Sequence, residues 1–370
     1  MRVCVLVVTA VVALATCTQA TTQVYQPCAG QADAVLLAQP GVPSQYVFTW
    51  SGVGLPTFGI TSFKQPVDAK DFSVNCSRLA EGYVSDVVVT PAGVEDHQST
   101  TLASLIEFSG PTLDKGEFVR RTILDTLTFK PVNMTSSSAT LVSTDNLIAV
   151  TMEVNTKSGI SKTNPHNFFA TNSFSVDLVI SGYTYNSTKS RLAMEIVTTT
   201  LERSVVRIEQ SRDINDEYSP SIFRRTTLQS TDNTGANEAH HAWKPVVFGN
   251  TTRKSTNMTV SFIGELAALD YSPANTYPQH IITASYDGAR TAMNVVNVTF
   301  STKGDKATAE KIIAWGSIVG PGKPFVPAMS TTLLATNITS YGVTIFAFIA
   351  GSIYLLVLRA TRATHSSQTV

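Results

Sequence analysis

The chain has 370 residues, with 27 basic and 27 acidic side chains, so its formal net charge is zero. This balance excludes the strong basic field that nucleic-acid binding requires. Charged residues make up only 15% of the chain, against about 25% in ordinary soluble domains, and Ser, Thr and Asn take their place. Such a composition favours β-structure with a glycan-covered surface.

The N-terminal residues have the pattern of a secretory signal peptide, predicted over residues 1–20. Arg2 supplies the positive charge, residues 3–15 are apolar, and Thr18-Gln19-Ala20 resembles a small-residue cleavage site. The rest of the chain is therefore expected to enter the secretory pathway.

Cysteine usage fits that compartment. Cys4 and Cys17 fall within the signal peptide, which leaves Cys28 and Cys76 as an even pair. In an oxidising compartment, one disulfide between these two residues is the economical prediction. One bridge is too few for a disulfide scaffold, so the fold must depend on its core.

The first half of the chain reads as short strands separated by turns rich in Gly and Pro. The expected strands are 46–50, 57–62, 84–90, 102–108, 122–129 and 140–154, the last being one long strand or a hairpin broken at Asp145-Asn146. A polar stretch follows at 155–172, with Gly159 and Asn164-Pro165 as breaks. It is either a domain boundary or a long surface loop.

The second half opens with the cleanest alternation in the chain, in which Phe174, Val176, Leu178 and Ile180 share one strand face. Further strands are expected at 192–208 (one strand or two), 258–262, 294–300 and 311–319. The predicted fold is an all-β, antiparallel ectodomain of two sandwich-like units, residues 21–160 and 161–338.

Seven Asn-x-Ser/Thr sequons support a lumenal ectodomain. They are Asn75, Asn133, Asn186, Asn250, Asn257, Asn297 and Asn337. A glycan must face solvent, and three of these residues lie on the polar face of expected strands. On the expected strands, Asn75 points to the face opposite Cys76, and Asn297 points to the face opposite Val296 and Val298. Asn257 points to the same face as Thr259 and Ser261. Asn337 lies so close to the expected membrane span that we expect poor glycosylation there.

Residues 339–358 are the predicted transmembrane helix. Tyr341–Leu358 contains no charge and approaches the roughly 30 Å of a hydrocarbon core. Arg359 and Arg362 follow, so the positive-inside rule places the tail, residues 359–370, in the cytosol. Together with a signal peptide this predicts a single-pass type I protein. Within the span, Ala347 and Gly351 stand four apart and are candidates for close helix packing.

No catalytic, cofactor or metal site is recognisable. Glu238, His240 and His241 are close in sequence, but neighbouring histidines on a strand point to opposite faces. Gly320–Lys323 reads as a Gly/Pro turn leading towards the membrane. The acidic segment 213–218 fails as a calcium loop because Tyr218 occupies the glycine position. A carboxylate pair for glycoside cleavage stays open, since its spacing exists only in three dimensions. We expect a protein that is not an enzyme.

The same acidic segment carries a resemblance. Residues 213–223 resemble the Asp-Glu-Tyr-x-Pro-x-x-Phe signature of the glycosylated lysosomal membrane protein family. The matching positions are Asp213, Asp216, Glu217, Tyr218, Pro220 and Phe223, with Trp243 and Pro245 downstream. Other short pieces occur in the same order, at 46–51, 73–77, 105–108, 164–172, 297–300 and 315–324, so the resemblance covers most of residues 46–358.

The resemblance implies a non-catalytic role. Members of that family act as heavily glycosylated accessory subunits of a lysosomal major facilitator superfamily transporter, a multi-pass protein that exports dipeptides, and they shield it from proteases. The implied partners are that transporter and the lipid bilayer, without nucleic acid, cofactor or small-molecule substrate. One departure is that residues 359–370 contain no tyrosine for a cytosolic sorting signal. The alternative is a cell-surface adhesion or receptor glycoprotein with a β-sandwich ectodomain.

Overall fold

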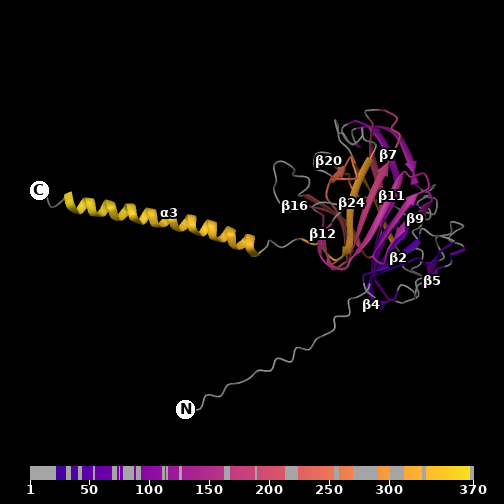
Figure 1. Ribbon diagram of the computed structural model, residues 1–370, viewed down its shortest axis with the longest axis horizontal. Coiled ribbons are helices and arrows are strands. Elements are labelled where there is room, and N and C mark those ends of the chain that lie inside the picture. Colours follow the sequence, from indigo (N-terminus) through magenta and orange to yellow (C-terminus); the bar gives the residue numbers. More distant parts are fainter. Residues whose placement is uncertain are drawn as a thin grey trace, which may run out of the picture. The chain divides into compact units, whose positions relative to one another are not determined.

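The computed structural model describes residues 22–30, 35–40, 44–52, 55–68, 73–74, 76–77, 87–88, 93–110, 113, 116–124, 127–161, 167–187, 190–212, 224–253, 258–269, 291–300, 312–326 and 331–366. The expected signal peptide, the signature segment 213–223 and the sequon residues Asn75 and Asn257 lie outside these residues. Two units are separable along the chain, residues 1–325 and residues 326–370. The first contains the β-strands and the second contains one helix (Figure 1).

The first of two large antiparallel sheets is built mostly from the early strands. Its order is β1 (Gln23–Tyr25), β2 (Val35–Gln39), β3 (Ser44–Ser51), β4 (Thr57–Val67), β7 (Val94–Ser109), β15 (Ser190–Leu201), β23 (Thr291–Thr299) and β21 (Phe262–Ile263), with β8 (Glu117–Ile123) paired to β7 and β22 (Ala267–Leu269) paired to β23.

The second sheet takes most of the later strands. Its order is β16 (Val205–Arg212), β17 (Arg224–Thr231), β18 (Asn237–Trp243), β24 (Ile312–Pro321), β14 (Ser173–Ser181), β11 (Ile148–Asn155), β10 (Ser138–Ser143) and β9 (Phe129–Met134), with β19 (Val246–Phe248) paired to β24 and β20 (Met258–Val260) paired to β19. Two short pairs complete the described strands, β5 (Ser73–Val74) with β6 (Val87–Val88) and β12 (Gly159–Ile160) with β13 (Phe168–Phe169).

The two sheets enclose one hydrophobic core. Its largest buried cluster draws residues from both sheets, and aromatic rings meet between them. Phe48 of the first sheet stacks on Phe174 of the second at 5.0 Å between ring centroids, and Phe300 lies 5.9 Å from Trp315. Such aromatic pairs stabilise a core by about 0.5–1.5 kcal/mol each beyond the area that they bury. The prediction of an all-β antiparallel fold followed by one apolar helix is confirmed.

The expected division into units at residues 160 and 161 does not separate these sheets. Strand β7 pairs with β15, and β11 pairs with β14, so each sheet joins strands from both sides of that boundary. The polar stretch 155–172 is a connection within the second sheet, because it links two strands that pair directly. Its described residues include the short β12–β13 pair, so the stretch is a structured connection and not a plain surface loop.

Several local predictions are confirmed by the strand register. In β14 the side chains of Phe174, Val176, Leu178 and Ile180 are all buried and alternate with half-buried neighbours. The chain turns between β10 and β11 at Asn146, whose φ is +57°, a conformation that Asn tolerates better than most residues. The segment 192–208 forms two strands, and they belong to different sheets.

Two predictions about phase and position are wrong. Thr259 and Ser261 were expected on the solvent face, but both are buried, while Phe262 is exposed. The reason is that the chain changes sheets here: β20 joins the second sheet and β21 the first. The strand expected at 122–129 instead spans the junction where β8 ends and β9 begins, with a turn hydrogen bond from Leu127 N to Leu124 O.

Cys28 and Cys76 form a disulfide, with their Cα atoms 5.3 Å apart. Cys28 is buried in the turn that follows the N-terminal strand β1, and Cys76 is half-buried just after β5. The bridge spans 48 positions, and closing a loop of this length in the unfolded chain stabilises a fold by about 4 kcal/mol in the chain-entropy model.

The helix α3 (Thr331–Ser366) is longer than the predicted span of 339–358. Its stretch Ala335–Ala360 is long and apolar enough to cross a membrane. Ala347 and Gly351 are exposed on this helix, as are the apolar side chains around them. Asn337 falls inside this apolar stretch, and poor glycosylation there stays a prediction.

Candidate functional site

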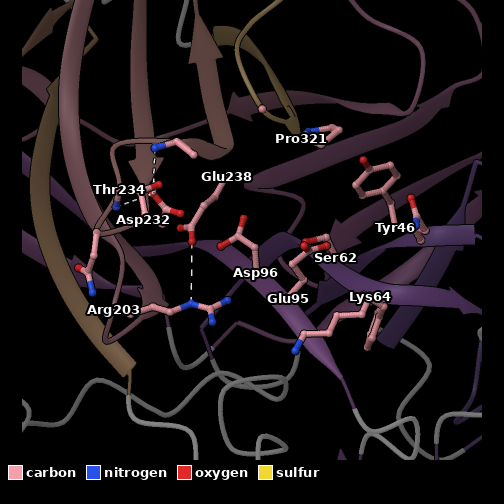
Figure 2. A pocket seen from close by; sticks show the side chains of 15 residues that line it. Tyr46, Ser62, Lys64, Glu95, Asp96, Arg203, Asp232, Thr234, Glu238 and Pro321 are labelled. Carbon is pink, nitrogen blue, oxygen red and sulfur yellow. Dashed lines mark hydrogen bonds and ion pairs between the residues drawn. The ribbon is translucent and has the colours of Figure 1, made fainter.

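A pocket of about 570 Å³ lies where strand ends and turns from both sheets meet. Its charged lining residues are Lys64 on β4, Glu95 and Asp96 on β7, Arg203 in the turn before β16, Asp232 after β17, and Glu238 on β18 (Figure 2). Ligand pockets in proteins usually measure about 300–1,000 Å³. We call this site the acid-pair pocket, after Asp96 and Glu238.

The strands around the pocket are irregular. The register shifts between Ser62 and Phe63 where β4 pairs with β7, and between Ser44 and Tyr46 where β3 pairs with β4. A third shift lies on β17, just before the turn that leads to Glu238. Such bulges bend strands and re-aim side chains, and they are frequent beside functional sites. They explain why these strand ends diverge and leave a space.

Two turns form part of the pocket wall. In the β17–β18 turn, Asp232 Oδ1 accepts hydrogen bonds from the backbone N–H groups of Thr234 (2.9 Å) and Ala236 (2.8 Å). These bonds, together with one from the Thr234 hydroxyl, lower the pKa of Asp232. After β24, Gly322 takes a φ of +63° and donates its N–H to the Glu238 carbonyl at 2.7 Å.

The centre of the pocket is the pair of carboxyl groups that names it. Figure 2 shows the carboxyl groups of Asp96 and Glu238 side by side, with Arg203 below them in this view. Asp96 is only 5% exposed, and the side chain of Glu238 is 10% exposed. Arg203 Nε lies 3.9 Å from Glu238 Oε1, which is too long for a hydrogen bond. The nearest basic group therefore neutralises the pair only in part.

Burial raises the pKa of Asp96 to about 8, with the neighbouring Glu238 charge and a hydrogen bond to that carboxyl adding to the effect. A backbone hydrogen bond at His97 and the charge of Arg203 oppose the shift. Two carboxylates held close together cannot both ionise cheaply. Asp96 is therefore protonated at acidic pH and largely so at neutral pH.

The two neighbouring histidines have separate environments. His241 points into the core, where its Nδ1 is 3.0 Å from the Thr100 hydroxyl and its ring packs against Trp243 and Trp315. His240 Nδ1 lies 3.1 Å from the Gly322 carbonyl. Burial lowers the pKa of His240 to about 4 and that of His241 to about 3. Among the described residues, no group of three His, Cys, Asp or Glu side chains is placed to hold a metal ion.

The described sequons lie on several different elements. Asn133 is exposed on β9, Asn186 is exposed in the loop after β14, Asn250 is half-buried after β19, and Asn297 is half-buried on β23. The Asn186 loop is fastened by the buried Glu107, whose Oε1 accepts the Asn186 backbone N–H at 2.6 Å. Val296 and Val298, the neighbours of Asn297, are buried in the core, as the strand phase predicts.

The two signature residues within the described structure are structural. Trp243 is buried, with its ring 5.5 Å from that of Trp315. The Pro245 carbonyl accepts the Ser261 N–H at 2.8 Å. The sequence offered little sign of the acid-pair pocket: Glu238 was considered only with the histidines, and Asp96 not at all. The sequence feature that could have indicated the pocket is the acidic residue Asp96 at the start of a run of His, Gln, Ser and Thr.

Comparison with known proteins identifies the family. The model of the family "Glycosylated lysosomal membrane protein" matches residues 33–362. Glycosylated lysosomal membrane protein A of Xenopus laevis is 22% identical over 244 residues, 62% of this chain and 59% of that protein. The Danio rerio protein is 28% identical over 195 residues, covering 51% and 46%, and the Bos taurus protein is 20% identical over 352 residues, covering 88% and 85%.

The matched part is thus less than two thirds of the Xenopus and Danio relatives. The family model, in contrast, extends over both sheets and most of the apolar helix. The chain therefore belongs to the glycosylated lysosomal membrane protein family and is a lysosomal membrane glycoprotein, and its described residues include one helix long enough to cross the bilayer.

Proposed function

We propose that this protein is a non-catalytic accessory subunit that stabilises a multi-pass transporter of the lysosomal membrane and protects it from proteolysis. The observation that carries the proposal is the family match over residues 33–362, because the matched region includes the β-sandwich and most of the apolar helix. The partner expected from the family resemblance is a major facilitator superfamily transporter of dipeptides. The ectodomain is then lumenal, and the chain has type I topology.

The ectodomain has properties that suit a shield. Its strands are tied into two extended sheets over a shared core, so few of the described strands can open far enough to enter a protease. Exposed sequons lie on different elements, such as Asn133 on β9 and Asn186 after β14. Glycans there would add bulk over separate parts of the surface.

The helix supplies a route to a partner within the membrane. Ala347 and Gly351 lie on one face of α3 and are exposed, and small residues at this spacing let a second helix approach closely. Gly342 offers a matched control because it lies nine positions from Gly351. At about 100° per residue, this spacing puts the two glycines on opposite faces.

The test is purification of the full-length tagged protein in mild detergent, followed by mass spectrometry of what accompanies it. We expect one stoichiometric multi-pass transporter, with a several-fold loss of it in Gly351→Leu and little loss in Gly342→Leu. Removing the glycoprotein from cells should also shorten the lifetime of that transporter, and lysosomal protease inhibitors should restore it.

The contrary result is recovery of the glycoprotein alone, with transporter lifetime unchanged on its removal. Surface labelling of intact cells then becomes the deciding measurement for a cell-surface adhesion or receptor role. That alternative is favoured by one feature, the absence of tyrosine from residues 359–370.

A further inference from the structure

A second pocket, of about 720 Å³, lies beside the sequon residue Asn297 and is called here the sequon pocket. Its apolar lining residues include Leu113, Ile208 on β16 and Phe262 on β21. Phe262 is 45% exposed. Exposed apolar surface with polar residues at its rim usually marks a place that another group covers. Because Asn297 is itself part of the lining, that group can be attached to this chain.

The strand register places Asn297 and Phe262 on the same face of the first sheet. Phe262 pairs with Thr299, the hydroxyl residue of the sequon. Paired residues share a face of a sheet, and so do residues two apart on one strand. Val296 and Val298, which alternate with Asn297, are buried in the core, so this face points outward. Asn297 is thus the diagonal neighbour of Phe262, and such neighbours are roughly 7–8 Å apart, which leaves space for a group between them.

The residue directly across from Asn297 is a glycine. Gly264 donates its N–H to the Asn297 carbonyl at 2.8 Å. The backbone does not require glycine here, because the φ of Gly264 lies outside the left-handed region. An added Cβ would lie 3.4 Å from the Asn297 carbonyl oxygen, an ordinary contact. A larger side chain would instead fill the space beside Asn297, and glycine leaves that space open.

The chemistry of the lining suits the first sugar of an N-glycan. One face of N-acetylglucosamine presents C–H groups, which pack favourably on the negative face of an aromatic ring such as that of Phe262. Its hydroxyl and acetamido groups need hydrogen-bond partners, and Gln210 and Glu265, both exposed at the pocket, can supply them. The volume of about 720 Å³ is within the range of about 300–1,000 Å³ that holds small ligands.

We propose that Asn297 carries an N-glycan whose innermost N-acetylglucosamine packs in the sequon pocket against the ring of Phe262. The sugar is then a part of the fold, since it covers the apolar surface where the chain crosses from β20 in the second sheet to β21 in the first. The inference rests on the lumenal ectodomain of the proposed topology, because N-glycans are added in the lumen, and it does not depend on the accessory role.

The test is thermal unfolding of the full-length protein in detergent, followed by the emission of its buried tryptophans, after glycopeptide mass spectrometry has established which sequons are occupied. Asn297→Gln should lower Tm by roughly 2–4 °C, whereas the matched control Asn133→Gln, at an exposed sequon on β9, should stay within about 1 °C of the wild type.

Enzymatic trimming of the folded protein tests the same contact without a variant that has to fold. An endoglycosidase that leaves only the innermost sugar should change Tm little. An amidase that removes this sugar as well should lower Tm by roughly 2–4 °C, and it should have little effect on Asn297→Gln.

Phe262→Ala separates a packed sugar from a glycan that only adds bulk. The variant should lower Tm by roughly 2–4 °C when Asn297 is glycosylated, and the loss should fall to less than half in the Asn297→Gln background, because the ring has no sugar to pack against. Val132→Ala removes another exposed apolar side chain, on β9, and should act equally in both backgrounds.

The outcomes separate this proposal from the topology on which it rests. Equal losses from Phe262→Ala in the two backgrounds, or no change in Tm when the innermost sugar is removed from Asn297, would overturn the proposal. If Asn133 and Asn186 carry glycans and Asn297 does not, the proposal fails and the lumenal topology stands. If no sequon is occupied, the lumenal topology fails with it.

Discussion

Replacing Asp96 with Asn tests whether this carboxyl group is held protonated inside the fold. Asn has nearly the shape of a protonated Asp but cannot ionise. Asp96 is almost fully buried next to Glu238, so the variant keeps the packing and removes only the titration. The matched control is Glu95→Gln, a change at the adjacent, exposed rim residue.

The magnitude follows from the difference between the folded and unfolded pKa values of Asp96. The folded value is about 8, whereas an unfolded Asp has a pKa of about 3.9. Between these values the folded protein binds one proton more than the unfolded chain, so its stability falls as pH rises. The slope is at most about 1.4 kcal/mol per pH unit, which gives an upper limit of roughly 3 kcal/mol between about pH 5 and about pH 7.5.

The assay is urea unfolding of the full-length protein in detergent, followed by tryptophan emission at the two pH values. All three tryptophans of the chain lie in the buried core of the sandwich, so the signal reports on that unit. The buried histidines also titrate, but they do so in both proteins and cancel in the difference. Asp96→Asn should gain roughly 2–3 kcal/mol in free energy of unfolding relative to the wild type on going from acidic to neutral pH.

A difference that stays constant within about 0.5 kcal/mol across this range would show that Asp96 is ionised in the folded state throughout. The pocket would then be well hydrated, and the case for a protonated, buried acid pair would fail. Glu95→Gln should follow the wild type at both pH values, because the Glu95 side chain is exposed and lies outside the buried acid pair.

Two further variants probe the surroundings of the pocket. In the wild type, folded His241 stays neutral because its pKa is about 3, whereas the unfolded chain takes up a proton at this histidine below about pH 6.5. His241→Gln removes this difference, so the loss of stability between about pH 7 and about pH 5 should shrink by up to about 2 kcal/mol. Equal pH slopes of the two proteins in urea titrations would contradict this. In Gly322→Ala, the positive φ of this residue should lower the free energy of unfolding by about 1–2 kcal/mol. The change should appear as a lower urea midpoint with an unchanged m-value. An unchanged midpoint would mean that the turn relaxes to another conformation.

Much of the fold was accessible from the sequence where local pattern decides structure. The alternation through Phe174 and Ile180 identified β14 and its buried face, and Asp145-Asn146 marked a hairpin turn. The long strand β7 was harder to predict, because its first half, from Asp96 to Thr101, is polar yet buried. These side chains find partners that no sequence window contains, such as Thr61 for His97 and His241 for Thr100.

The pairing of strands lay beyond the sequence pattern, and so did the acid-pair pocket. Asp96 and Glu238 meet because the start of β7 in one sheet and the start of β18 in the other line the same pocket. The β-bulges beside them are not predictable from residue type. The boundary expected at residue 160 fails for the same reason, since strands from the two halves pair with each other. The order of strands in a sheet is set by long-range contacts, so the pattern of short strands in the sequence does not determine it.

The position of β24 has a consequence for how the protein is made. This strand, Ile312–Pro321, is the last one described before the helix, yet it lies in the middle of the second sheet between β14 and β18. During synthesis those two neighbours emerge first and must wait for it, with their facing edges unpaired. Exposed strand edges invite mispairing, and long-range pairing folds slowly. The second sheet therefore cannot close until translation has nearly reached the apolar helix, so the facing edges of β14 and β18 stay open to mispairing until this last described strand emerges.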